Sequence, residues 1–210
     1  MKLYSYPAAP NPRRLHIFMA EKGLDIPFEP VDLMKGGQFD PAFVALNPMS
    51  TVPVLVTDDG TVLTQVVAIC DYLEAVHPEP ALLGRTAVEK GEIREWSTRI
   101  FTEGLMSVAE AFRNSNPNFA NRSLPGPLAL PQEPVLVERG IKRLELFWQT
   151  LDARLAGRDY VVGDSYTMAD IDALCTCDFA RWIRKSIPED CANIQRWYAA
   201  VSARPSAKAG

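Results

Sequence analysis

The sequence is poor in histidine and cysteine, and this scarcity excludes several kinds of site. Only His16 and His77 occur among 210 residues, and the cysteines form no CxxC pair and no zinc-ligand spacing. Each cysteine lies in an apolar helical context, which predicts buried free thiols: Cys70, Cys175, Cys177 and Cys191. We therefore expect no metal site and no disulfides.

Long apolar runs and an excess of basic residues are also missing. No segment approaches the ~20 apolar residues of a membrane-spanning helix, and the first residues show no secretion signal. A net charge of −4, with 47% hydrophobic and 23% charged residues, is typical of an ordinary globular protein. These features predict a cytoplasmic protein that binds neither membranes nor nucleic acid.

The first 78 residues alternate between strand and helix patterns. The expected order is a strand at 3–6, a helix from Asn11 to Gly23, an edge strand at 27–31, a short helix at 41–46, two strands around Asp59-Gly60 and a helix at 65–76. This order is typical of a thioredoxin-like domain, a mixed sheet with helices on both faces. Because His77-Pro78-Glu79-Pro80 cannot continue a helix, we expect a linker at 79–86.

The remaining residues, 87–210, are expected to form an all-helical domain. Apolar residues between Val137 and Leu155 recur every three or four positions, which predicts one long helix. Thr167 and Asp170 fit a capping box before a second, largely buried helix. Residues 113–132, rich in Pro, Asn and Ser, predict a long loop, and such loops are often functional. The fold class is therefore α/β plus all-α.

The most informative segment is Val52–Val56, which is apolar enough for a buried strand but has proline as its second residue. Asp59-Gly60 then predicts a hairpin, and Gln65 precedes a helix reading Ala-Ile-Cys-Asp-Tyr-Leu-Glu. This order resembles the glutathione transferase family, in particular its bacterial-type cytosolic members. The capping box at Thr167, roughly 100 residues later, extends the resemblance over nearly the whole chain.

The resemblance implies how glutathione, the co-substrate, would be bound. It implies that Val52-Pro53 is a cis peptide and that the backbone of Val52 pairs with the cysteinyl unit of glutathione. Gln65 and the backbone N–H of Val66 would hold the γ-glutamyl end at a helix N-terminus. Two residues beside Gly36-Gly37 would reach the glycyl carboxylate: Lys35 and Gln38. The resemblance also implies a homodimer.

A glutathione transferase must stabilise the thiolate, which is the nucleophile. Lowering a thiol pKa by two units from about 8.5 requires about 2.7 kcal/mol. Serine-type and cysteine-type members use a side chain in the first loop, but this chain has Ala8 or Ala9 at the serine position and Asn11 nearest the cysteine position. Asn11 either caps the following helix or donates its amide to the sulfur. Ser5 and Tyr6 are alternative donors.

Two further predictions concern charge and substrate. Arg13 and Arg14 follow Asn11 in the first helical turn, where we expect them to be solvated. An apolar electrophile would be held by the helical domain, with three candidate residues: Met106, Phe112 and Trp182.

Two functions remain open at this point. The first is an enzyme that conjugates glutathione to an electrophilic small molecule, or reduces that molecule with it. The second is a catalytically weak binding protein of the same fold, for hydrophobic ligands or a protein partner, since fold does not fix function. A disulfide oxidoreductase would need a cysteine in the 7–12 loop, which has none.

Overall fold

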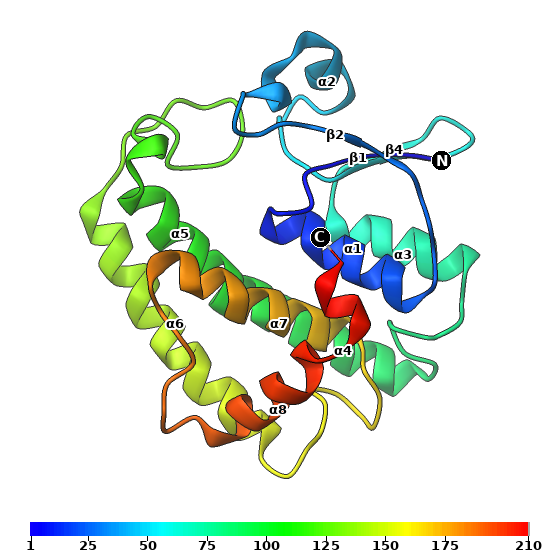
Figure 1. Cartoon of the computed structure of the whole chain (residues 1–210), viewed down its shortest axis with the longest axis vertical. Helices are drawn as coiled ribbons and strands as arrows, with labels where there is room; N and C mark the ends of the chain where they lie inside the picture. The colour runs from blue at the N-terminus through cyan, green and yellow to red at the C-terminus, as the bar shows by residue number, and fades with distance from the viewer. Residues whose placement is uncertain (210) are drawn as a thin grey trace. The chain divides into compact units, whose positions relative to one another are not determined.

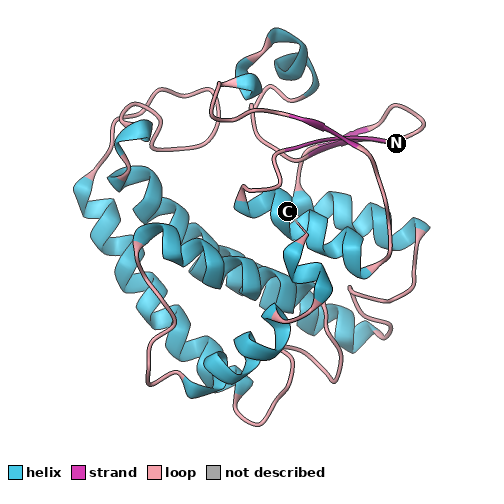
Figure 2. Ribbon diagram, viewed as in Figure 1, coloured by secondary structure: helices cyan, strands magenta, loops and turns pink. Residues whose placement is uncertain are grey.

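The computed structural model describes residues 1–209 and divides the chain into two compact units (Figures 1 and 2). The first unit comprises Met1–Pro80, the short segment Pro125–Leu128 and the C-terminal residues from Lys208. The second comprises Ala81–Leu124 and Ala129–Ala207. The predicted linker is thus split, because residues 81–86 belong to the second unit.

A four-stranded mixed sheet forms the centre of the first unit. Its strands are β1 (Lys2–Ser5), β2 (Phe28–Pro30), β3 (Val54–Val56) and β4 (Val62–Leu63), in the order β2-β1-β3-β4. β2 runs parallel to β1, whereas β3 is antiparallel to both β1 and β4. The C-terminal ends of β1, β2 and β4 and the N-terminal end of β3 therefore meet at one edge of the sheet. We call this the loop edge.

Three helices cover the sheet, as predicted. α1 (Pro10–Glu21) and α3 (Val66–Val76) lie together on one face, and α2 (Pro41–Leu46) lies on the other (Figure 1). Alternation along the strands explains both layers. Leu3 and Leu55 are fully buried towards one face, while Tyr4 and Val54 pack on the other with Phe43 of α2. The thioredoxin-like prediction is confirmed.

The second unit is helical. Its helices are α4 (Ala87–Arg99), α5 (Met106–Ser115), α6 (Pro134–Leu155), α7 (Met168–Ala180) and α8 (Ala192–Ser202), with a π-helical turn at Ile100–Leu105. The predicted apolar stripe lies on α6, where Leu144, Trp148 and Leu151 are buried. The predicted loop at 113–132 begins too early, because α5 continues to Ser115 and contains Arg113.

The π-helical turn brings backbone close to α6. Arg143 of α6 donates to the carbonyl of Thr102 (2.6 Å), and Ser107 donates to that of Glu103 (2.6 Å). A Cβ atom on Gly104 would lie 2.8 Å from the ring of Phe147. The turn thus depends on glycine, and neighbouring side chains bond the carbonyls that its irregular geometry exposes.

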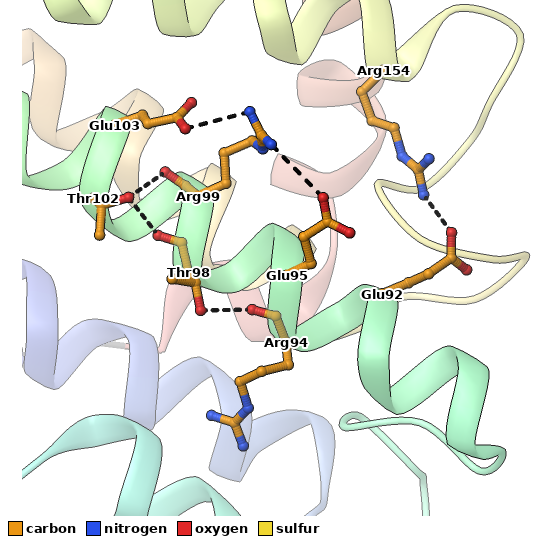
Figure 3. A network of polar contacts seen from close by, with 8 residues as sticks. All are labelled: Glu92, Arg94, Glu95, Thr98, Arg99, Thr102, Glu103 and Arg154. Carbon is orange, nitrogen blue, oxygen red and sulfur yellow. Dashed lines mark hydrogen bonds and ion pairs between the residues drawn. The ribbon is translucent and has the colours of Figure 1, made fainter.

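The outer surface of α4 and this turn carries charges that pair along the same helix (Figure 3). The guanidinium of Arg99 lies 3.7 Å from Glu95 and 3.4 Å from Glu103. The hydroxyls of Thr98 and Thr102 donate to helix carbonyls one turn earlier. Together these residues border a polar surface groove of about 330 Å³. Exposed pairs of this kind contribute little to stability.

The capping box of α7 is present as predicted. Thr167 is the N-cap, and the carboxylate of Asp170 accepts from the backbone N–H of Thr167 (3.0 Å). Asp170 also accepts from the N–H of Val161 (2.9 Å) and from Nε1 of Trp197 (2.9 Å). Burial raises the pKa of Asp170 to about 6, against the opposing effect of these donors. Asp170 is thus the polar centre of the helical core.

Three predictions about other features can be compared with the structure. All four cysteines are buried free thiols, as predicted. Within residues 1–209, no helix combines the length and apolarity that a bilayer crossing requires. That same part of the chain contains no group of three potential metal-ligating side chains.

Candidate functional site

The loop edge gathers most of the predicted site residues. Tyr4 is opposite Val54 and Ser5 is opposite Pro30 in the strand register. The loop after β1, the loop after β2, the segment before β3 and the start of α3 therefore leave the sheet on the same side. Asn11, Val52 and Gln65 lie on three of these segments, and Lys35 and Gln38 on the fourth.

The peptide between Val52 and Pro53 is cis, which confirms the prediction. A tight turn holds the preceding residues, because Nδ2 of Asn47 donates to the carbonyl (2.8 Å) and hydroxyl (3.0 Å) of Thr51. Ser50 adopts a left-handed backbone with φ of 54°. Sequence reasoning did not identify Asn47 as a positioning residue. The only signal for it in the sequence was the Asn47-Pro48 pair, which lies shortly before Pro53.

The N-terminus of α1 differs from the prediction. Ala9, not Asn11, is the N-cap, because Pro10 has the fixed φ that suits the first helical position. Asn11 is the second helical residue and Pro12 the third. Prolines have no N–H, so Asn11 supplies the one backbone donor among the first three helical positions. The expectation that Asn11 caps the helix is therefore wrong.

The side chain of Asn11 is oriented by Arg14. Nη1 of Arg14 donates to Oδ1 of Asn11 (3.0 Å), which leaves the two amide hydrogens on Nδ2 as donors. Arg14 is only 2% exposed, so the expectation that it is solvated is wrong. The reason is helical spacing: Arg14 lies one turn before Phe18, on the face of α1 that packs against the core.

Ser5 lies inside the first unit. Its hydroxyl pairs with Nε2 of His16 (2.8 Å), and its side chain has no exposed surface. The ring of Phe28 lies edge-on to His16 at 5.0 Å. Tyr6 is partly buried and packs against the cluster that contains Val52 and Val54. Asn11, Ser5 and Tyr6 were considered as donors to the sulfur of glutathione. Of these, Ser5 is already hydrogen-bonded to His16 in the interior of the first unit.

We expect this pair to make stability depend on pH. Burial lowers the pKa of His16 below its ordinary value of 6.5. As the pH falls below about 6.5, the unfolded chain binds a proton that the folded chain rejects, so the contribution of His16 to stability is lost. The stability difference between wild type and His16→Gln should therefore shrink between about pH 7.5 and 5.5, measured by urea unfolding. Asp170 also titrates near this pH range, but it is present in both proteins and its contribution cancels in the difference. A stability difference that stays constant between these pH values would contradict the predicted role of His16.

The residues predicted to bind the two ends of glutathione differ in exposure and in hydrogen bonding. Gln65 is the exposed N-cap of α3 and makes no side-chain capping bond, so the N–H of Val66 has no helical partner. Gln38 is 8% exposed, and its Oε1 has no hydrogen-bond partner among the described residues. Lys35 is exposed, with Nζ 3.4 Å from Asp32. A buried amide oxygen without a partner is uncommon in a folded protein.

Two of the three residues predicted for the apolar substrate lie together in the second unit. The rings of Phe112 and Trp182 are 5.4 Å apart, and both contact Phe179. Trp182 is 49% exposed. Met106 lies six residues before Phe112 on α5, about 120° round the helix axis, and is not part of this cluster. The structure therefore groups Phe112 with Trp182 and leaves Met106 apart.

Together these features define a class of protein: a thioredoxin-like unit with a cis-proline at its loop edge, followed by an all-helical unit. Comparison with known proteins identifies the family. The family models for the glutathione S-transferase N-terminal and C-terminal domains match residues 8–76 and 132–205. The chain belongs to the glutathione S-transferase family, and it is a glutathione-dependent transferase.

Individual relatives match most or nearly all of the chain. Glutathione S-transferase 2 of Saccharomyces cerevisiae is 35% identical over 214 positions, which cover 99% of this chain and 88% of that protein. A maleylacetoacetate isomerase of Rattus norvegicus is 32% identical over 171 positions, 80% of this chain and 73% of that one. The crystal structure of Gtt2 from Saccharomyces cerevisiae matches with a TM-score of 0.89 and 35% identity, covering 99% of each chain.

Proposed function

We propose that this transferase forms a thioether between the sulfur of glutathione and an electrophilic carbon of an apolar small molecule. The observation that carries the proposal is the loop edge, where the cis peptide before Pro53, the donors of Asn11 and the start of α3 converge. In the reaction the thiolate attacks the carbon, a carbon–sulfur bond forms, and a leaving group such as chloride departs with its electron pair. The thiol proton is released to solvent.

Glutathione is proposed to bind across the loop edge. The backbone of Val52 pairs with the cysteinyl unit, and the γ-glutamyl carboxylate lies at the start of α3, on Gln65 and the N–H of Val66. A helix N-terminus favours an anion there. Gln38 is proposed to donate from Nε2 to the glycyl carboxylate, because a carboxylate only accepts hydrogen bonds. Lys35 would add its charge at that end.

The thiolate is proposed to accept from Asn11. Its Nδ2 and its backbone N–H provide two donors at one residue, at the positive end of the α1 dipole. A hydrogen bond to a charged group contributes roughly 1.5–3 kcal/mol, and a helix terminus about 0.3–1 kcal/mol. Together these reach the ~2.7 kcal/mol that a two-unit shift requires. Tyr6 and Ser5 are the alternative donors, and Ser5 would first have to leave His16.

The apolar acceptor is proposed to contact the aromatic cluster of Phe112 and Trp182, with Met106 as a further candidate. Exposure of Trp182 supports this role, because a large aromatic side chain at a surface often marks a binding site.

The alternative, a catalytically weak binding protein, rests on Ala8 and Ala9 in the first loop and on the buried state of Ser5. One experiment separates the two. The transferase should be retained on immobilised glutathione, elute with free glutathione and turn over a chlorinated aromatic acceptor. A binding protein would be retained without turnover, and failure of retention would overturn the proposed glutathione site.

We further propose that the protein is a cytoplasmic homodimer acting in detoxification. Family membership and the absence of disulfides support this proposal. Sedimentation equilibrium at micromolar concentration should give about twice the 23.3 kDa mass of the chain. A stable monomer would contradict the dimer without affecting the glutathione site.

A further inference from the structure

Arg113, in the last turn of α5, is a half-buried cation that pairs with no carboxylate in the described part of the chain. Its Nη2 donates to the backbone carbonyls of Arg122 (2.6 Å) and Leu124 (2.8 Å). Its Nε is buried and has no acceptor among residues 1–209. Because a guanidinium carries five N–H donors, the two on Nη1 are left without a protein partner in the same residues.

A second cation lies close to this guanidinium. Burial and the charge of Arg122 lower the pKa of Arg113 to about 10, so Arg113 stays protonated at neutral pH. Both guanidiniums lie over the ring of Phe119, at 4.4 Å for Arg113 and 5.7 Å for Arg122. Elsewhere in this unit, Arg139 and Arg154 each pair with a glutamate. Two positive charges beside one ring therefore favour an anion at this place.

Aromatic rings lead from the two arginines to the surface. Phe119 contacts Phe112 edge-on, with ring centroids 5.3 Å apart, and Phe112 contacts the exposed Trp182 at 5.4 Å. All of these residues belong to the second unit. This unit thus presents an aromatic surface that has positive charge at one end.

Hydrogen bonds hold the two arginines in place. Nη2 of Arg122 donates to the carbonyl of Asn118 (3.2 Å). Nε2 of Gln132 donates to the carbonyls of Arg113 and Asn116, both at 2.7 Å, and so closes the segment that carries both cations. A cation whose position is fixed before binding loses little side-chain entropy when it binds an anion.

We propose that Arg113 and Arg122 form a carboxylate-binding site for the acceptor. Nη1 of Arg113 donates to the carboxylate, and Arg122 adds the second positive charge. The ring of the acceptor then lies along Phe112 and Trp182. The inference rests on the proposed function and narrows its substrate class to aryl electrophiles that carry an acid group.

Two acceptors that differ in one charge test this site: a chloronitrobenzoate and the corresponding neutral chloronitrobenzamide. In both, the chloride is para to the varied group and the nitro group is ortho to the chloride, so glutathione displaces the same chloride. We expect Arg113→Gln to raise KM for the benzoate about tenfold with little change in kcat, a typical effect of one lost hydrogen bond to a charged group. KM for the benzamide should stay nearly constant, and added salt should raise only the benzoate KM.

A second variant and a control remove the same charge. Arg122→Gln keeps the backbone carbonyl that Arg113 bonds, and it should raise the benzoate KM about threefold. Arg158→Gln is the matched control, because Arg158 is exposed and lies beyond the C-terminal end of α6, about 30 Å from the start of that helix. It should change neither KM.

An unchanged benzoate KM in both Arg113→Gln and Arg122→Gln, or an equal rise in Arg158→Gln, would disprove the carboxylate site while the transferase activity stands. If wild type turns over neither acceptor, the proposed function fails, and isothermal titration with nitrobenzoate and nitrobenzamide decides the site alone. The site then stands if wild type binds the benzoate more tightly and Arg113→Gln removes this difference, and it fails if the two bind equally.

Discussion

Replacing Lys22 with Met is expected to lower the free energy of unfolding by about 3–5 kcal/mol. The side chain of Lys22 has no exposed surface, and its Nζ lies 2.6 Å from a carboxylate oxygen of Glu74. The same ammonium donates to the carbonyls of His77 and Pro80, both at 2.7 Å. One buried cation therefore bonds three acceptors, and it fixes the last residues of the first unit to α1 and α3.

A double-mutant cycle in urea or guanidinium unfolding separates the ion pair from the backbone bonds. Lys22→Met with Glu74→Leu removes both charges and should recover about 1–2 kcal/mol of the loss, since a buried pair replaced by apolar residues is often near neutral. The remaining loss belongs to the carbonyls of His77 and Pro80. If Lys22→Met alone lowers the free energy of unfolding by less than about 1 kcal/mol, Lys22 does not hold the segment at residues 77–80 in place.

Replacing Asn11 with Ala is expected to raise the pKa of bound glutathione by about one to two units, from the loss of roughly 1.5–3 kcal/mol of hydrogen bonding to the thiolate. Turnover at neutral pH should fall while affinity for glutathione changes little. Gln65→Ala should have the opposite effect, weakening binding more than the chemical step, because Gln65 lies at the γ-glutamyl end. Thiolate absorbance and binding titrations of the complexes measure both effects.

A matched variant separates this role from a structural one. Asn11→Asp keeps an oxygen for Nη1 of Arg14 but has no amide donor and adds a negative charge. It should preserve the melting temperature and raise the thiol pKa at least as much as Asn11→Ala. If Asn11→Ala lowers only the melting temperature, Asn11 serves only to hold Arg14, and another donor acts on the sulfur.

Local signals in the sequence were sufficient for most of the fold. The helix at 41–46 has the predicted bounds, because proline at its start and Asn47 after its end both act within one turn. The hairpin at Gly60 and the capping box at Thr167 are also short-range patterns, whereas the cis peptide before Pro53 was expected from the resemblance to the family. Each of these short-range patterns depends on residues close together in the chain, so each can be read without tertiary contacts.

The contacts that sequence reasoning missed join distant residues or depend on burial. Ser5 and His16 are eleven positions apart, and Lys22 bonds carbonyls 55 and 58 residues away. No local sequence pattern predicts such long-range pairs. Asn-Pro at 11–12 resembles a cap followed by the first helical residue, but Pro10 allows α1 to begin two residues earlier, with Ala9 as its N-cap. The location of the site was thus predictable, whereas the orientation of its donors was not.

The central claim is that the loop edge binds glutathione and stabilises its thiolate. The most direct measurement is the pH titration of thiolate absorbance in the wild-type protein saturated with glutathione. The account predicts an apparent pKa about two units below the ordinary thiol value of about 8.5. A bound thiol that titrates at about 8.5 would contradict it.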